Sequence, residues 1–331
     1  MKQFNSRIIL YIIVILLIIG GVFYTLNREE EESLTVGIIQ IVEHPSLDAA
    51  REGFQEILAE NGYEEGENIT YNFKNAQGDM ANANTIANQF ANDKPDLVLA
   101  IATPTAQAAA NSISDIPILI TAVTDPVDAG LVDSIEKPNT NITGTSDLTP
   151  VKEQLNLLTE IAPDAEEIGT IYNAGESNSV VQAELTKEVC EELDLELNEA
   201  TADNSGNVQQ AAQSLAEDVD ALYIFTDNTV VSSLETVIQE AEENDIPLIV
   251  GESDSVERGG LATRGLSYNE LGRKTGQMAL KIIEEDAEPG NMPIEYLEEE
   301  EMKLVINLKA AENMGVSISD ELKDQADELI E

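Results

Sequence analysis

The chain has 331 residues, of which 42% are hydrophobic, so it is long enough for two α/β domains with separate cores or for one large domain. Its 64 acidic and 17 basic residues give a formal net charge of −47, and a surface this negative repels phosphates and excludes nucleic-acid binding. The acids are spread along the chain, which is typical of a solvated surface adapted to high salt, although attraction of cationic ligands is an alternative reason for them.

The first predicted element is an apolar segment from Ile8 to Leu26. As a helix, its uncharged residues would span about 28 Å at roughly 1.5 Å per residue, which is close to the thickness of a bilayer core. Lys2 and Arg7 precede the segment and acidic residues follow it, so the positive-inside rule places everything after Arg28 outside the cell. A cleaved signal peptide is the alternative, but no clear cleavage site follows. We therefore predict an uncleaved anchor on the extracytoplasmic face of the cell membrane.

Beyond a short acidic tether (27–33), apolar β-type runs alternate with amphipathic helical stretches, the pattern of a parallel sheet covered by helices on both faces. In the first series, the predicted strands are Leu34–Val42, Ile69–Phe73, Leu97–Ile101 and Ile116–Ala122. The predicted helices between them are Leu47–Asn61, Ala81–Asn92 and Thr105–Ser112. This series predicts one doubly wound α/β unit.

A second series repeats the architecture but not the sequence. Its predicted strands are Glu167–Tyr172, Glu196–Ala200, Ala221–Phe225 and Pro247–Val250, and its predicted helices are Pro150–Ile161, Ser179–Leu193, Val208–Glu217 and Thr229–Asn244. The polar stretch 141–150 is expected to cross between the two units, and the predicted helix Tyr268–Glu285 with the Pro- and Gly-containing loop after it looks like a further crossing.

The expected fold is therefore α/β, with two Rossmann-like lobes whose parallel sheets are joined by a multi-strand hinge around a cleft. Residues 1–7 are expected in the cytoplasm, 8–26 in the anchor, 34–145 in lobe 1 with completion by about 268–300, and 146–267 in lobe 2. The last segment, 301–331, is expected to return across the hinge to a lobe that the sequence does not decide.

Small polar loops follow the predicted strands of both units. Ligands of open α/β sheets bind at the carboxyl ends of the strands, where loops and helix N-termini present unpaired N–H groups. The candidate binding residues in these loops and at the start of the crossing helix are Glu43, His44, Thr103, Thr105, Asp125, Glu176, Ser177, Asn178, Ser179, Asp227, Asn228 and Tyr268. We expect them to line one crevice between the lobes.

At these loops the sequence resembles the TrpX-like family of ABC-transporter substrate-binding proteins, and the resemblance runs from about Val36 to the end. It is carried by VEHPSLDAAREGF (42–54), NAQGD (75–79), ATPTAQ (102–107), TAVTDPV (121–127), SDLTPV (146–151), YNAGESNSVVQ (172–182), TDNTV (226–230), LGRKTGQMA (271–279) and KLVINLKAA (303–311). The resemblance implies the type I periplasmic-binding-protein fold, an amino-acid ligand that is often aromatic, and an importer with separate permease and ATPase subunits. Members are commonly lipoproteins, and this chain departs by lacking the lipobox cysteine.

Each candidate residue has an ordinary structural role as an alternative. Ser177 to Ser179 begin a predicted helix, so they either cap it or hold the carboxylate of the ligand, which we expect. Asp227 is expected to pair with the ammonium group of the ligand, and Asp125 is a second candidate, although both sequences around them also form turns. Thr103 and Thr105 are N-cap candidates that could also donate to the ligand.

Among the remaining candidates, His44 precedes a proline at a helix start, and Tyr268 could pack against a ring of the ligand.

Catalytic chemistry is disfavoured by the residue inventory. The chain has one cysteine, Cys190, and one histidine, so an internal disulfide is impossible and most zinc sites and nucleophile-base pairs are excluded. It also lacks a nucleophile elbow, a P-loop and a glycine-rich dinucleotide fingerprint. We expect a monomeric receptor without metal or cofactor, not an enzyme. A sensory module signalling to a partner receptor, or a receptor for another solute such as a sugar, remains the alternative.

Overall fold

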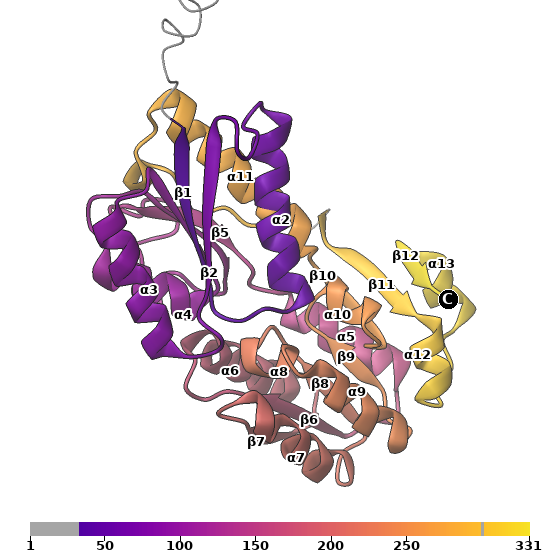
Figure 1. Ribbon diagram of the computed structural model, residues 1–331. Coiled ribbons are helices and arrows are strands. Elements are labelled where there is room, and N and C mark those ends of the chain that lie inside the picture. Colours follow the sequence, from indigo (N-terminus) through magenta and orange to yellow (C-terminus); the bar gives the residue numbers. More distant parts are fainter. Residues whose placement is uncertain (1–32, 299–300) are drawn as a thin grey trace, which may run out of the picture.

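In the computed structural model, which describes residues 33–298 and 301–331, the strands form two separate sheets (Figure 1). A five-stranded sheet has the order β2-β1-β3-β4-β5, and a seven-stranded sheet has the order β12-β11-β10-β9-β8-β6-β7. The predicted cytoplasmic segment and anchor (1–26) lie outside the described residues. Among the helices of the described part, none is both long and apolar enough to cross a membrane.

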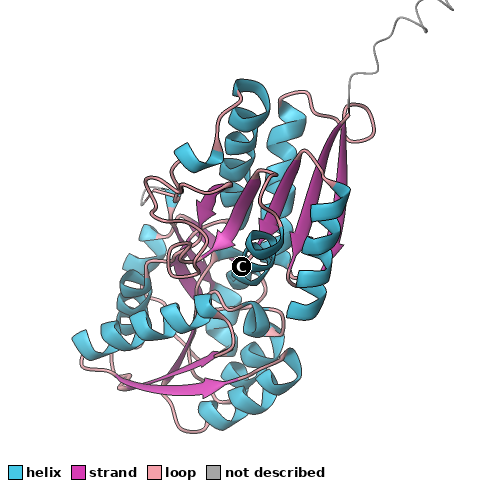
Figure 2. Ribbon diagram, turned by 90° about the vertical axis from the view of Figure 1, so that its left-hand side faces the viewer, coloured by secondary structure: helices cyan, strands magenta, loops and turns pink. Residues whose placement is uncertain are grey.

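Lobe 1 is built on the five-stranded sheet, whose strands are all parallel. Its strands are β1 (Leu34–Gln40), β2 (Ile69–Asn75), β3 (Leu97–Ile101), β4 (Ile118–Val123) and β5 (Ile142–Ser146), and its helices are α2 (Pro45–Glu60), α3 (Met80–Asp93), α4 (Thr103–Ser112) and α11 (Tyr268–Glu285), with a short 3-10 turn η1 (Pro289–Asn291). Every residue of β3 and β4 is buried, because these strands lie inside the sheet with helices over both faces (Figure 2).

Lobe 2 is built on the seven-stranded sheet. Its strands are β6 (Glu167–Tyr172), β7 (Glu196–Thr201), β8 (Ala221–Ile224), β9 (Leu248–Val250), β10 (Ala262–Gly265), β11 (Lys303–Asn307) and β12 (Glu328–Ile330). Its helices are α5 (Val151–Ile161), α6 (Ser177–Glu192), α7 (Ser205–Ala216), α8 (Asn228–Val231), α9 (Leu234–Glu243), α10 (Ser253–Glu257), α12 (Leu308–Asn313) and α13 (Asp320–Gln325). The sheet is parallel except for β10 and β11, which run antiparallel because β11 enters from the side of lobe 1.

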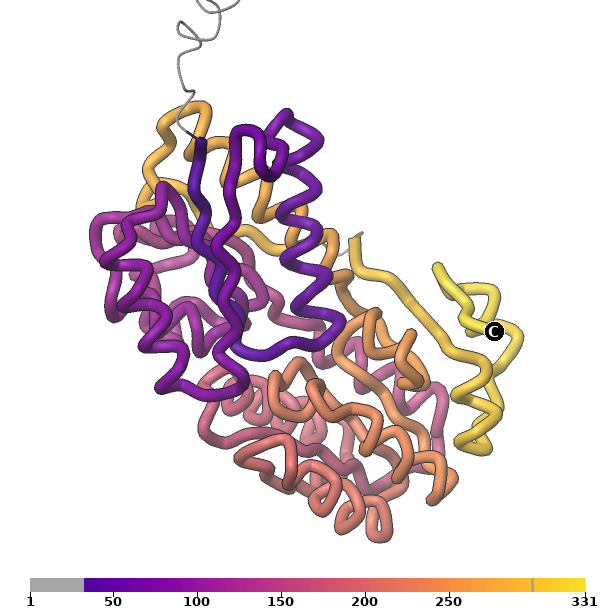
Figure 3. The backbone as a smooth tube through the Cα atoms, viewed as in Figure 1, coloured from indigo at the N-terminus to yellow at the C-terminus, as the bar shows by residue number. Residues whose placement is uncertain are grey.

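The chain passes between the lobes at the end of β5, after β10, and again before β11, so the late helix α11 belongs to the core of lobe 1 (Figure 3). There it packs along α2 at a distance that only glycine permits. A Cβ atom on Gly272 would lie 1.9 Å from the carbonyl oxygen of Ala50, and one on Gly53 would lie 2.1 Å from that of Asn269. These two glycines therefore allow α11 to pack directly against α2 in lobe 1.

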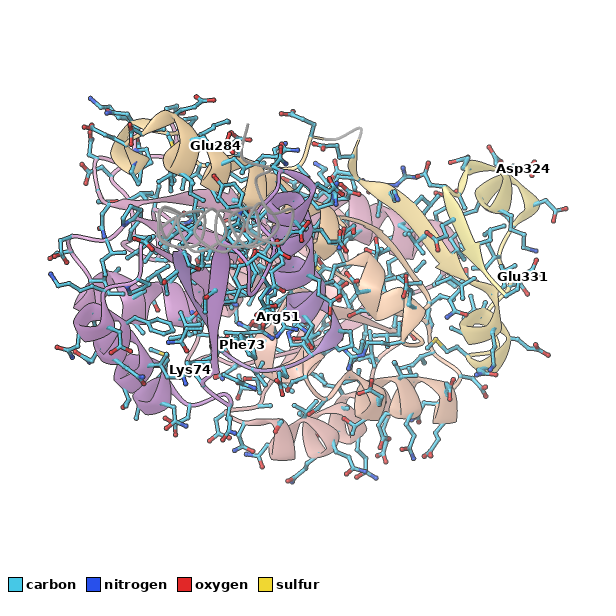
Figure 4. All side chains as sticks on the ribbon, turned by 45° about the horizontal axis from the view of Figure 1, so that its top comes forward. Arg51, Phe73, Lys74, Glu284, Asp324 and Glu331 are labelled. Atoms are coloured by element: carbon cyan, nitrogen blue, oxygen red, sulfur yellow. The ribbon has the colours of Figure 1, made fainter. Side chains whose placement is uncertain are left out.

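Arg51 of α2 fixes the same helix to the sheet edge. Its guanidinium carbon lies 4.4 Å above the ring centroid of Phe73 on β2, and the two side chains are seen together in Figure 4. Such a cation–π contact covers the ring and fixes the position of the helix over the edge strand.

One predicted helix is wrong in extent. The stretch 229–244, predicted as a single helix, is divided into α8 and α9 at Ser232 and Ser233. The Ser232 hydroxyl donates to the Thr229 carbonyl oxygen, and Ser233 leaves the helical region with φ −128°. Serine side chains that hydrogen-bond the backbone compete with helical bonds in this way.

The stretch 141–150, predicted only as a crossing, begins with strand β5, and strands β10, β11 and β12 were not predicted. Gly144 of β5 has φ 142°, and a Cβ there would lie 2.0 Å from the Ile120 carbonyl oxygen of β4. The close approach of the two strands therefore requires glycine here, and β5 lacks the apolar pattern from which strands are predicted.

Candidate functional site

The carboxyl ends of the two sheets face each other, and the helices that follow the strands begin at this junction (Figure 1). Among the described residues, two hydrogen bonds from one side chain to another join the facing lobes. The Ser46 hydroxyl at the start of α2 donates to Glu252 Oε1 over 2.9 Å, and Gln107 Nε2 of α4 donates to Ser177 Oγ over 3.4 Å. The lobes are therefore in contact across the cleft, in a closed arrangement.

Two cavities lie between the lobes and share Asn228. The inner cavity leaves about 10 Å³ in which the centre of a water-sized group can move. It is lined by His44, Ser46, Leu47, Thr226, Asp227, Asn228, Val231, Glu252 and Tyr268. The outer cavity leaves about 110 Å³ by the same measure. It is lined by Ile41, Val42, Gln77, Gly78, Glu176, Asp203, Asn204, Ser205, Asn228, Thr229 and Ser232. Five candidate residues predicted from the sequence therefore line these cavities: His44, Glu176, Asp227, Asn228 and Tyr268.

Asp227 is fully buried and caps helix α8. Its Oδ2 accepts from the Asn173 N–H at 2.7 Å and the Ser179 hydroxyl at 2.6 Å, and its Oδ1 accepts from the Val230 N–H at 2.7 Å. Burial raises the pKa of Asp227, while these donors oppose the shift. The geometry favours a capping role that fixes the loops after β6 and β8 relative to each other.

Glu176 stands beside Asp227 at the outer cavity. It accepts from Asn228 Nδ2 at 2.6 Å and from the Thr229 hydroxyl at 2.9 Å, and burial together with the charge of Asp227 raises its pKa to about 7. Asn228 is thus held by Glu176 at the border between the two cavities.

Glu252 follows β9 and was not among the candidates, although its loop was predicted to line the crevice. Its side chain is 1% exposed and accepts from the hydroxyls of Ser46 and Ser255 and from the Ser255 N–H. Burial and the neighbouring Asp254 raise the pKa of Glu252 to about 8. The signal that could have found it is its position after a strand in the same series as Asp227.

His44 is the N-cap residue of α2 but makes no capping hydrogen bond. Its side chain is 8% exposed, and neither ring nitrogen has a hydrogen-bond partner among the described residues. Burial, with a smaller contribution from Arg258, lowers the pKa of His44 to about 3. The ring is therefore neutral at physiological pH, with one donor and one acceptor nitrogen, and it lines the inner cavity.

Two other candidates carry buried polar atoms without partners in the described structure, Thr103 Oγ1 and Asn178 Oδ1. Both lie at helix starts that face the cleft, Thr103 on α4 and Asn178 on α6. Ala102, which precedes Thr103, has φ 81° and ψ 151°, a conformation that costs free energy for a residue with a Cβ and that often marks functional loops. The first N–H groups of α6, at Ser177 to Ser179, lack acceptors within their own helix.

The remaining candidates lie outside the inner cavity or make local bonds. The Thr105 hydroxyl donates to the carbonyl oxygens of Ile101 and Ala102, so it closes the start of α4. Asp125 is only half-buried and accepts from the N–H groups of Val127 and Asp128, as in a turn. Glu43 is exposed.

Tyr268 lines the inner cavity with its ring, and its hydroxyl donates to Asp147 at the hinge.

None of the clusters of histidine, cysteine and carboxylate side chains in the described residues is arranged to hold a metal ion. Cys190 of α6 is buried.

Comparison with known proteins agrees with this geometry. The family described as ABC transporter substrate binding protein matches residues 35–330. A tyrosine-binding protein of Clostridioides difficile is 44% identical over 292 residues, which cover 87% of this chain and 84% of the relative. A Streptococcus pneumonia ABC domain solved in complex with L-Trp is 32% identical, with a TM-score of 0.85 over 90% of this chain and 100% of that one.

A third relative shows how the lobes are arranged. The ligand-free, open structure of a Clostridium difficile substrate-binding protein with adhesive properties is 44% identical, yet its TM-score is only 0.67 over 90% of this chain and 99% of that one. The less similar sequence, solved with L-Trp, superposes better. The lobes of this chain are thus closer to the arrangement of the ligand complex than to the open form.

Proposed function

The chain belongs to the family of ABC transporter substrate-binding proteins, and we propose that it binds a free amino acid with an aromatic or large apolar side chain between its lobes. The observation that carries this ligand is the pair of relatives whose descriptions name tyrosine and L-Trp, since both are at least 32% identical and match over 84% or more of their length. Binding in the cleft would involve no chemistry on the ligand.

The two charged ends of an amino acid fit the two kinds of polar group at the cleft. The N–H groups at the start of α6, beside Ser177 to Ser179, favour a carboxylate because a helix N-terminus carries partial positive charge. The carboxylates at the inner cavity, Asp227 and Glu252, favour an ammonium group. A sugar carries neither charge. A solved solute-binding protein with bound myo-inositol is 16% identical and a solved sugar ABC transporter protein is 12% identical, so their likeness supports the fold alone.

The closed arrangement supports our proposal that the chain delivers its ligand to a permease with ATPase subunits. Because the ligand touches both lobes, it stabilises the closed form, and a closed form presents a surface that the open form lacks. We propose that the chain works as a monomer on the outer face of the membrane, held there by the predicted anchor at 8–26.

A thermal-shift screen of the twenty amino acids on the full chain in mild detergent tests the ligand class. L-tyrosine, L-tryptophan or L-phenylalanine should raise the melting temperature, since a ligand at about 100 times its dissociation constant adds roughly 2.7 kcal/mol. N-acetyl-L-tyrosine should raise it much less, because acetylation removes the ammonium charge. A response to sugars and none to amino acids would overturn the proposal.

A further inference from the structure

We infer that Glu252 and His44 form the pocket for the ammonium group of the ligand, and that Asp227 positions this pocket without contacting the ligand. This assignment rests on the proposed function, in which the ligand is a free amino acid. It differs from the expectation that Asp227 is the direct ammonium partner.

The hydrogen bonds of Asp227 leave little room for a ligand. A carboxylate offers about four acceptor positions. Three are used by the donors of Asn173, Ser179 and Val230, and the Thr229 N–H also donates to this carboxylate. Three of these four donors are backbone N–H groups, which cannot rotate away, so an ammonium group would have to displace part of the α8 cap.

Glu252 has a free acceptor position. Among the described residues, its Oε1 accepts from two hydroxyls and its Oε2 accepts from the Ser255 N–H at 3.0 Å, so three donors occupy about four acceptor positions. The carboxyl group of Asp254 is the neighbour with which it can share a proton. One of the hydroxyls belongs to Ser46 of the opposite lobe, so this partner is present only when the lobes meet. Before closure, Glu252 therefore has still more acceptor capacity for an incoming cation.

His44 lines the same cavity, and both of its ring nitrogens are buried without a hydrogen-bond partner among the described residues. A buried polar atom without a partner costs free energy, so such atoms in a cleft indicate where a ligand group binds. Because the ring is neutral, one nitrogen can accept from an ammonium group. An imidazolium could only donate and would repel it.

Size and charge agree with an ammonium group. The cavity leaves about 10 Å³ for the centre of a water-sized group, which is near the minimum that holds one water, and an ammonium group is about as large as a water molecule. None of the described residues that line the cavity is positively charged, whereas Asp227 and Glu252 are carboxylates. Burial favours the protonated forms of these carboxyl groups in the empty protein, and the ammonium group of the ligand would stabilise the charged form of Glu252 on closure.

Calorimetry with the full chain in detergent tests the pocket, using L-tyrosine and 3-(4-hydroxyphenyl)propanoate, which lacks only the ammonium group. Wild type should prefer L-tyrosine by roughly 30-fold or more, as expected for a buried charge pair. Glu252→Gln should lose about the same factor for L-tyrosine and should no longer discriminate between the two ligands. Gln keeps the shape, and the hydroxyls of Ser46 and Ser255 can rotate to accept from its amide.

Glu43→Gln is the matched control, because this exposed carboxylate at the cleft edge does not line the cavity and its loss should leave the discrimination between the two ligands intact. Melting curves show that each variant is folded. If Glu252→Gln still prefers L-tyrosine as strongly as wild type does, the pocket is elsewhere and the inference is overturned, while the proposed function stands. If wild type binds none of L-tyrosine, L-tryptophan and L-phenylalanine, the proposed function itself is contradicted. The same holds if wild type binds the analogue as tightly as it binds L-tyrosine.

Discussion

The hydroxyl of Tyr268 donates a hydrogen bond of 2.5 Å to Asp147 Oδ2, and this contact joins two of the passages between the lobes. Asp147 follows β5, on the first passage, and Tyr268 begins α11, after the second. Asp147 is 3% exposed and accepts otherwise from the Thr124 hydroxyl at 3.0 Å. Because the ring of Tyr268 also lines the inner cavity, the ligand site and the hinge share one side chain.

Tyr268→Phe should therefore destabilise the protein while keeping the cavity wall. Removal of the hydroxyl leaves a buried carboxylate with one donor fewer, at a cost of about 1–3 kcal/mol in the free energy of unfolding. Urea unfolding monitored by circular dichroism measures it. Tyr63→Phe is the control, since its hydroxyl makes only a 3.4 Å bond to Glu284 near the surface, and a change within about 0.5 kcal/mol is expected. Equal losses in both variants would contradict the hinge role.

The neutral state of His44 should make the closed protein sensitive to acid. Its pKa is lowered from 6.5 to about 3, so the unfolded or opened chain binds a proton between these values while the closed chain does not. The free energy of unfolding should therefore fall as the pH drops below 6.5, by about 3 kcal/mol at pH 4. The loss is smaller where opening of the lobes exposes the ring to water and lets it bind the proton without unfolding. His44→Gln cannot titrate. The difference in unfolding free energy between wild type and this variant should change with pH over that window, and a constant difference would contradict the buried neutral ring.

The sequence predicts where the polar loops lie but not which carboxylate is free. The loops with Asp227 and Glu252 both follow strands of the second lobe and both side chains cap short helices, so their patterns are equivalent. The difference comes from the Asn173 loop, whose N–H reaches Asp227 from the neighbouring strand end. Such a contact depends on the register of β6 beside β8, which no local pattern encodes.

The missed elements have a similar physical reason. β5 reads Ile-Thr-Gly-Thr-Ser, with neither an apolar run nor a clear alternation, and it is a strand because it is buried against β4 and the returning segment near Glu295. The expected two-lobed α/β fold and the resemblance to ABC-transporter substrate-binding proteins are confirmed. Periodic apolar runs, which dominate both cores, are visible in the sequence, whereas tertiary pairing of short polar strands is not.

Salt should stabilise the protein. The 64 acidic residues exceed the 17 basic ones, so exposed carboxylates repel one another. The Debye length over which this repulsion acts is about 3 Å at molar ionic strength, compared with about 10 Å at 0.1 M. The melting temperature should rise through a potassium chloride series, while an equal osmolality of sucrose should give a smaller rise. A flat or falling trend with salt would indicate that the acidity serves another purpose, such as cation binding.

The apolar segment from Ile8 to Leu26 should remain in the mature protein, because its length matches a bilayer core and no cleavage site is evident. Intact-mass measurement on membrane fractions checks this. A mature chain beginning near Glu29 would identify the segment as a signal peptide.

Glu252→Gln should also stabilise the unliganded protein at alkaline pH, even though it weakens ligand binding. The pKa of Glu252 is raised from 4.5 to about 8, so the folded chain holds a proton there that the unfolded chain releases. The wild-type free energy of unfolding should therefore fall as the pH rises from 4.5 through 8, by on the order of 1–4 kcal/mol. Gln mimics the neutral acid, so the variant should gain this amount at pH 8 and nothing below pH 4.5. Urea unfolding at both pH values measures the gain, with Glu43→Gln, an exposed carboxylate at the same cleft edge, as the control. A binding residue that destabilises the empty fold is expected where function opposes stability. If Glu252→Gln is destabilised at pH 8 as much as it is at pH 4.5, the carboxyl group serves the fold through its hydrogen bonds and not the ligand.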